Sequence, residues 1–326
     1  MQPGGGACYE IELAWGRLRR TYLKWCRPAY VRGMAQLRRG DATGAPHEIL
    51  DPRDLKYCSN QCTAHWLPEH DPFAWRDGLP AVRWGLAELQ IGAWPLLGLT
   101  WALWHLPPWW RLTALLPAVA LSWWASFFRN PWRIVPTDAD AVVAPADGKV
   151  VDVTELAEYE FFNGPAVRIG IFLSIFNVHI NRAPRAGRVL GMHYKPGEFL
   201  DARNPESSIR NEFMWIGFEE GEGDAEVADG LEPAGSSVSA PDGASEQGAG
   251  GRPRMKFAVR QISGLLARRI VCALRPGQAV SRGENFGMIK LGSRTELILP
   301  RDAVRLEVVV GQTVQAGSTV VARVVG

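Results

Sequence analysis

The 326-residue sequence predicts a mainly β domain of the α+β class, preceded by a helical N-terminal region with a membrane hairpin. Three observations predict this organisation. A segment at 10–39 combines basic and aromatic residues, two tryptophan-rich apolar runs lie between 91 and 128, and short apolar strands separated by turn residues fill the chain after 136. We therefore divide the chain into an extension at 1–80, a hairpin at 81–135 and a β domain at 136–326.

The composition excludes several classes of protein. A net charge of +2 is too small to argue for a nucleic-acid partner. Five scattered cysteines, an odd number, favour a reducing compartment over a disulfide framework. The first residues contain acids and no apolar core of secretory length, so nothing in them marks the protein for export.

The extension begins with a helical pattern. Residues Glu10 to Arg39 predict one or two amphipathic helices broken at Pro28. Their basic and aromatic residues suit a helix on anionic lipid, and a solvated basic face packed on the protein fits equally well. Residues 40–80 predict irregular structure. Cys58, Cys62 and His65 lie there, but they lack a clear second pair of ligands and form a weak zinc pattern, so we predict no metal site.

The hairpin is predicted from two apolar runs, Ile91–Leu106 and Leu112–Phe128. Nine of the 14 tryptophans lie between 84 and 132, and tryptophan at the ends of apolar runs is typical of a membrane interface. Each run is shorter than the ~20 residues that cross a bilayer as a helix. We expect a helical pair that spans thinly or dips into one leaflet of the cell membrane, with a buried helical pair as the alternative. Flanking arginines favour the cytoplasmic side for both ends.

The most informative stretch is Gly283 to Pro300, centred on Gly292 and Ser293. It predicts two strands that meet at a tight turn. Glycine leaves its carbonyl unshielded, and the serine hydroxyl lies one residue beyond that carbonyl. With a nearby base, the hydroxyl attacks the carbonyl and moves the acyl group from nitrogen to oxygen. Elimination and hydrolysis then leave a pyruvoyl group. An isolated Gly-Ser dipeptide, however, is usually only a turn.

Two earlier segments carry acid–base residues. Ala141–Val153 predicts strand, turn and strand, with Asp147 in the turn, where aspartate usually caps its own backbone. Ile169–Pro184 predicts a buried strand that enters a polar stretch containing His179. A lone histidine in this position is more often simply hydrogen-bonded.

The run from Val259 to Pro300 resembles the phosphatidylserine decarboxylase family in its short form, and the resemblance extends from about Phe127 to the C-terminus. In that family the Gly-Ser bond cleaves itself and the serine becomes a pyruvoyl prosthetic group. The resemblance implies decarboxylation of phosphatidylserine to phosphatidylethanolamine at a membrane. It also implies a β chain of 1–292 and an α chain of 293–326 that stay associated, and we leave self-association open.

The resemblance also assigns site residues. Ser293 would become the pyruvoyl group after cleavage at Gly292, and His179 and Asp147 would form a triad with Ser293. We further assign Arg294, Asn211 and Glu212 to substrate binding. Two positions depart from the family: Phe176 replaces a histidine of long forms, and Asn285 replaces an arginine common in short forms.

Two further segments bear on the fold. Glu219–Gly251 is acidic and lacks Lys and Arg, which predicts a disordered insert without a catalytic role. Val308–Val324 has turn glycines among valines and resembles the hairpin of barrel-sandwich domains such as lipoyl carriers, so we expect a barrel-sandwich-like β domain. This leaves three alternatives: a carrier or binding module with Lys149 as the modified residue, a membrane-anchored scaffold, or a decarboxylase of another serine-headed lipid of the archaetidylserine type.

Overall fold

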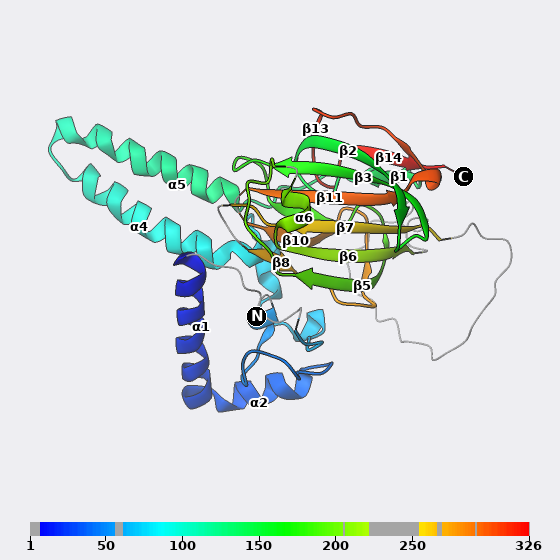
Figure 1. Cartoon of the computed structure of the whole chain (residues 1–326). Helices are drawn as coiled ribbons and strands as arrows, with labels where there is room; N and C mark the ends of the chain where they lie inside the picture. The colour runs from blue at the N-terminus through cyan, green and yellow to red at the C-terminus, as the bar shows by residue number, and fades with distance from the viewer. Residues whose placement is uncertain are drawn as a thin grey trace.

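The computed structural model has a helical N-terminal region followed by a β region, which confirms the mainly β class (Figure 1). It describes residues 7–55, 61–204, 206–221, 254–265, 269–290 and 292–325. In Figure 1 two long helices project away from the strands as an arm, and the first helices lie below the base of that arm.

The extension folds as the sequence predicts. Helix α1 (Ala7–Cys26) ends just before helix α2 (Pro28–Leu37), because proline lacks an amide hydrogen and starts a new helix at its first position. The indole Nε1 of Trp66 donates to the Met34 carbonyl at 2.8 Å and fixes the irregular segment on α2. The short 3-10 helices of this region are η1 (Pro52–Asp54), η2 (Pro68–His70), η3 (Ala74–Gly78) and η4 (Arg83–Gly85).

The arm consists of α4 (Leu86–Trp104), η5 (Pro108–Ala114) and α5 (Leu115–Phe127). The two long helices pack closely, and a Cβ on Gly92 would lie 2.3 Å from Nε1 of Trp124. The helical pair predicted from the apolar runs is therefore present. Within the described parts of the chain, no helix combines the length and apolarity that crossing a bilayer requires.

The β region contains one large and two small sheets. The strands are β1 (Ala141–Val143), β2 (Gly148–Tyr159), β3 (Gly164–Leu173), β4 (Ile180–Arg182), β5 (Gly187–Lys195), β6 (Phe213–Glu220), β7 (Lys256–Ile262), β8 (Ile270–Cys272), β9 (Ala279–Val280), β10 (Asn285–Ile289), β11 (Ser293–Pro300), β12 (Val304–Leu306), β13 (Thr313–Val314) and β14 (Val320–Val324). The short helices α6 (Ser207–Arg210) and η7 (Arg301–Ala303) connect strands.

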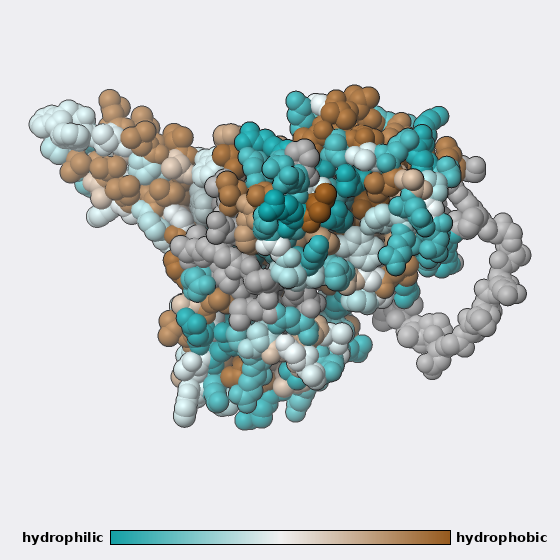
Figure 2. Space-filling model, viewed as in Figure 1, coloured by the Kyte–Doolittle hydropathy of each residue, from teal (hydrophilic) through white to brown (hydrophobic). Residues whose placement is uncertain are grey.

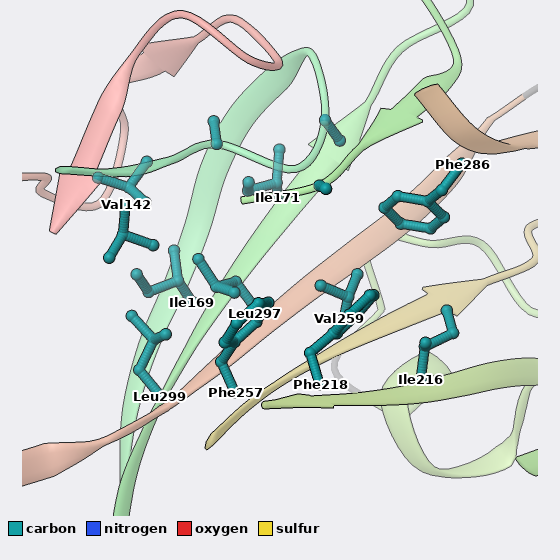
Figure 3. Packing of buried hydrophobic residues seen from close by; sticks show 14 of the residues in the cluster. Val142, Ile169, Ile171, Ile216, Phe218, Phe257, Val259, Phe286, Leu297 and Leu299 are labelled. Carbon is teal, nitrogen blue, oxygen red and sulfur yellow. The ribbon is translucent and has the colours of Figure 1, made fainter. Parts of the chain in front are cut away.

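The large sheet has the order β13-β2-β3-β11-β7-β6-β5-β9, and the small sheets have the orders β1-β14-β12 and β4-β10-β8. All pairings are antiparallel. The inner face of the large sheet carries a continuous apolar core. Figure 3 shows this core, with Ile169, Leu297 and Val259 projecting from three neighbouring strands. Strand β11 therefore runs through the middle of the sheet.

Three local expectations differ from the structure. Strands β10 and β11 do not pair with each other across Gly292 but lie in different sheets. Strands β1 and β2 likewise separate, and β13 and β14 do not form a hairpin, although Gly311 and Gly317 have the positive φ of turn glycines. In each case the sequence marks the strand, but the partner strand comes from a distant segment.

The acidic insert predicted at 219–251 lies mostly outside the described residues. Glu219 and Glu220, at its start, are the last residues of β6. Glu219 pairs with Lys256 across the sheet. Cys58 of the zinc pattern also lies outside the described residues, and Nδ1 of His65 lies 2.9 Å from the Thr63 carbonyl oxygen.

Candidate active site

The Gly292–Ser293 peptide lies where the central strand β11 begins. Gly292 has a φ of +71°, a left-handed conformation that glycine adopts without a side-chain clash. Ser293 is fully buried and pairs with Leu173 of β3. Its Oγ has no hydrogen-bond partner among the described residues. Buried polar atoms are normally hydrogen-bonded, so this unpartnered hydroxyl is a candidate reactive group.

His179 contacts Gly292, the residue before the predicted cleavage point. Its Nε2 accepts the Gly292 amide hydrogen at 3.1 Å, which leaves the ring proton on Nδ1 for donation to the Asn177 carbonyl at 3.0 Å. The ring also packs on Phe127, with 4.4 Å between ring centroids. Burial lowers the pKa of His179 to about 4. The imidazole is therefore neutral at physiological pH and holds an unprotonated nitrogen at the predicted cleavage site.

Gly264 was missed by the sequence reasoning. A Cβ on this residue would lie 1.7 Å from the Gly292 carbonyl oxygen and 2.8 Å from its carbonyl carbon. Only glycine allows the backbone to come this close to the Gly292 carbonyl. Its one sequence signal is a glycine two residues after the strand that ends at Ile262, and that signal is common at strand ends.

Asp147 has partners other than His179. One carboxylate oxygen accepts the Ala316 amide hydrogen at 2.8 Å, and the other binds Arg133 at 2.6 Å. Burial raises the pKa of Asp147, opposed by the Ala316 amide and Arg133. The structure thus brings His179 to Gly292, while the carboxylate of Asp147 binds Arg133 and Ala316 and does not hydrogen-bond to His179. The carbonyl of Asn177, rather than a carboxylate, orients the imidazole. A triad role for Asp147 stays a prediction.

Asn211 and Glu212 lie at the start of β6. The Asn211 amide donates to the carbonyls of Leu200 and Ser263, which ties the preceding loop to the end of β7. Glu212 is buried, and its Oε1 accepts the Tyr194 hydroxyl at 3.0 Å. Burial raises the pKa of Glu212 to about 7, opposed by the Tyr194 hydrogen bond and by Arg269. Its Oε2 has no partner among the described residues.

Arg294 points away from this group. Side chains alternate along a strand, so Arg294 lies on the opposite face of the sheet from Ser293. Its guanidinium binds Glu296 at 2.9 Å and also contacts Asp152. Arg294 therefore does not share a face of the sheet with Ser293, and its contact with substrate stays a prediction.

Comparison with known proteins identifies a family to which this chain is similar. The family model described as phosphatidylserine decarboxylase matches residues 121–229 and 246–322. A phosphatidylserine decarboxylase proenzyme of Rhodopirellula baltica is 44% identical over 275 residues, which cover 82% of this chain and 98% of the relative. The proenzyme of Carboxydothermus hydrogenoformans is 40% identical over 200 residues, covering 61% of this chain and 79% of the relative. That of Syntrophus aciditrophicus is 35% identical over 251 residues, covering 77% and 97%.

Proposed function

The chain belongs to the phosphatidylserine decarboxylase family, and from this premise we propose that it cleaves itself at Gly292–Ser293 and then decarboxylates phosphatidylserine to phosphatidylethanolamine. The observation that carries the proposal is a neutral, buried imidazole whose Nε2 accepts the amide hydrogen of Gly292, the residue before the predicted cleavage point.

Self-cleavage would use the Ser293 hydroxyl, the Gly292 carbonyl and the imidazole of His179. The Ser293 hydroxyl attacks the Gly292 carbonyl carbon, and Nε2 of His179 takes the hydroxyl proton. In the structure Nε2 accepts the Gly292 amide hydrogen, so this hydrogen bond must give way to one from the Ser293 hydroxyl before the transfer. The close approach of Gly264 fixes the carbonyl that is attacked. The proton then moves to the departing nitrogen, and the chain is joined by an ester.

The site also fits the pyruvoyl group that the family implies at residue 293. The Ser293 Oγ has no hydrogen-bond partner among the described residues, and the Gly292 carbonyl oxygen occupies the position that a side chain of residue 264 would take. A pyruvoyl group supplies a ketone that condenses with the substrate amine and accepts electrons as carbon dioxide leaves. It derives from Ser293, so no separate organic cofactor is needed.

The two chains would remain together after cleavage. The α chain would begin at 293, so β11 belongs to it. Strand β11 lies between β3 and β7 of the β chain, with pairs from Ser293 and Leu173 to Pro300 and Ala166 along one edge. Strand β14 pairs with β1 in the same way. Backbone hydrogen bonds on both edges of β11 hold the fragments without the covalent link.

We further propose that the arm formed by α4 and α5 docks this enzyme on the cytoplasmic side of the cell membrane. Figure 2 shows apolar side chains along the arm. Trp94, Trp101, Trp109 and Leu116 are among its most exposed, at 69–75% of their surface. Apolar and indole side chains of this size suit the boundary between headgroups and acyl chains.

The test is the chemical state of residue 293. The wild-type protein should separate into two fragments on a denaturing gel, with a small fragment that resists Edman sequencing and reacts with hydrazines, because a pyruvoyl end has a ketone and no amine. Ser293→Ala should stay at full length and form no phosphatidylethanolamine. Ser318→Ala, a turn serine of the same fragment, should behave as wild type. A free serine amine at 293, or an active Ser293→Ala variant, would refute the proposal. Assaying phosphatidylserine beside archaetidylserine would separate the two lipid classes.

A further inference from the structure

Ser293, Ser263 and Glu212 lie side by side in a row at the ends of three neighbouring strands. Arg294 of β11 pairs with Ile262 of β7, which pairs with Phe213 of β6. The residues one step beyond these pairs are Ser293, Ser263 and Glu212, and the Ser263 amide donates to the Glu212 carbonyl at 3.0 Å. Neighbouring strands lie about 4.8 Å apart, so the backbones of Ser293 and Glu212 are separated by roughly 10 Å.

The three side chains share the inner face of the sheet. The next row consists of Thr295, Gln261 and Met214, all buried. The Asn181 side chain donates to Thr295 Oγ1 at 2.9 Å and accepts from Gln261 at 2.8 Å, which shows that this row faces the interior. Residues two apart in a strand point to the same side, so Ser293 and Glu212 face the interior as well.

Both ends of the row carry an unsatisfied polar atom. Ser293 Oγ and Glu212 Oε2 are buried without a hydrogen-bond partner among the described residues. The other oxygen of Glu212 is held by the Tyr194 hydroxyl, so the carboxyl group has a fixed donor on one side and an open oxygen on the other. Its raised pKa, about 7, means that a large share of the molecules carry a proton on Glu212 near neutral pH.

We propose that Glu212 is the acid that gives a proton to the substrate carbon from which carbon dioxide departs. This rests on the proposed decarboxylase function, because the substrate amine must reach residue 293 and the reacting carbon is the atom next to that amine. The substrate then extends from Ser293 along the row toward Glu212.

This proton transfer needs no oxidant or reductant, and water is the only other reactant. The bond between that carbon and its carboxylate breaks, carbon dioxide leaves, and the electron pair stays behind. The Glu212 carboxyl donates its proton to the carbon and a new C–H bond forms. The resulting carboxylate, stabilised by the Tyr194 hydroxyl and by the positive charge of Arg269, regains a proton from solvent. Glu212 is thus assigned to proton donation, and His179, with Nε2 at Gly292, to self-cleavage.

The decisive variant is Glu212→Gln, which keeps the shape of the side chain and removes the acid. It should still cleave and yield a hydrazine-reactive α chain, while formation of phosphatidylethanolamine falls on the order of 100-fold or more. Without this acid, a proton should instead add to the carbon of residue 293 that is bonded to the substrate nitrogen. The substrate nitrogen would stay on the α chain as an alanine amino end, and the lipid would leave as an aldehyde. Edman sequencing after incubation with phosphatidylserine should therefore detect alanine.

Full-rate product formation by cleaved Glu212→Gln would overturn this assignment while leaving the proposed function intact. An uncleaved wild-type chain would instead overturn the proposed function itself. Tyr194→Phe gives a second measurement, because the lost hydrogen bond no longer stabilises the carboxylate and the pKa of Glu212 should rise further. The alkaline fall in decarboxylation, expected near pH 7 in the wild type, should move to higher pH. An unmoved alkaline limb in Tyr194→Phe would also count against Glu212.

Discussion

The sheet interior and the arm depart from the usual distribution of residues in opposite ways. Around the start of β11, His179, Ser293 and Glu212 are polar and almost completely buried. On the arm, Trp109 and Leu116 are apolar and about three-quarters exposed. Buried polar groups and exposed apolar surfaces are the informative exceptions in a folded protein, since each costs stability unless a partner completes it.

The two regions therefore need different partners. The sheet interior needs a polar reactant at Ser293, and the arm needs an apolar environment. The two meet at Phe127, the last residue of α5, which packs on the ring of His179. A buried ion cluster joins them a second time: Glu88 of α4 binds Lys290, two residues before Gly292, and also approaches Arg269, which binds Glu12 of α1.

The largest effect should come from His179. His179→Ala removes the proposed base, which lies beside Gly292, and self-cleavage should slow on the order of 100-fold to 10,000-fold. Gel analysis of freshly translated protein measures this rate. In the wild type the rate should be constant from neutral pH down to about pH 5 and fall as the pH drops through about 4, because protonation then occupies Nε2. His193→Ala, on the exposed side of β5, is the control. Prompt cleavage of His179→Ala would show that another group is the base.

Gly264→Ala should disturb the sheet site next most strongly. The added Cβ overlaps the Gly292 carbonyl oxygen, so the carbonyl must shift, and a displacement of that size slows a positioned reaction on the order of 100-fold. Gly191→Ala is a matched control in β5, since no atom lies within 4 Å of its added Cβ. Equal cleavage rates in both variants would mean that the approach of Gly264 has no part in cleavage.

The ion cluster tests whether the two regions are coupled. Glu88→Gln leaves Lys290 and Arg269 with one buried carboxylate fewer, which should lower the free energy of unfolding by about 3–5 kcal/mol. Glu198→Gln breaks the exposed pair with Arg210 and should cost far less, because water screens an exposed ion pair. Denaturant unfolding of the uncleaved Ser293→Ala background gives both values. Similar losses in the two variants would argue against a structural coupling through Glu88.

The smallest effect is expected on the arm. Leu116→Asp should weaken binding to anionic phospholipid vesicles at least about tenfold, because a buried leucine contributes roughly 1.5–3 kcal/mol, and self-cleavage should be unaffected. Ile209→Asp on α6 has a similar exposure, 70% against 75%, and should leave vesicle binding unchanged. Flotation with vesicles measures both. If the two substitutions weaken binding equally, the arm is not the docking surface.

Local chemistry made part of this molecule predictable. The break at Pro28 followed from the missing amide hydrogen, and the helices of the arm followed from two continuous apolar runs. The strands were marked by alternation and turn residues, although the predicted hairpins across Gly292 and near Gly311 were wrong about pairing. The Gly292–Ser293 peptide and His179 were identified by their resemblance to a family motif. Such a motif names residues but does not show where they lie in space.

Tertiary structure alone decided how these residues meet. His179 and Gly292 are 113 positions apart, and their hydrogen bond depends on the small sheet in which β4 pairs with β10. Asp147 lies with Arg133 and Ala316, Gly264 reaches the Gly292 carbonyl, and Glu212 joins the row of Ser293 only through the register of three strands. Sequence patterns report the few residues on either side of a position. Strand partners are chosen by burying a shared core, and that choice involves the whole chain at once.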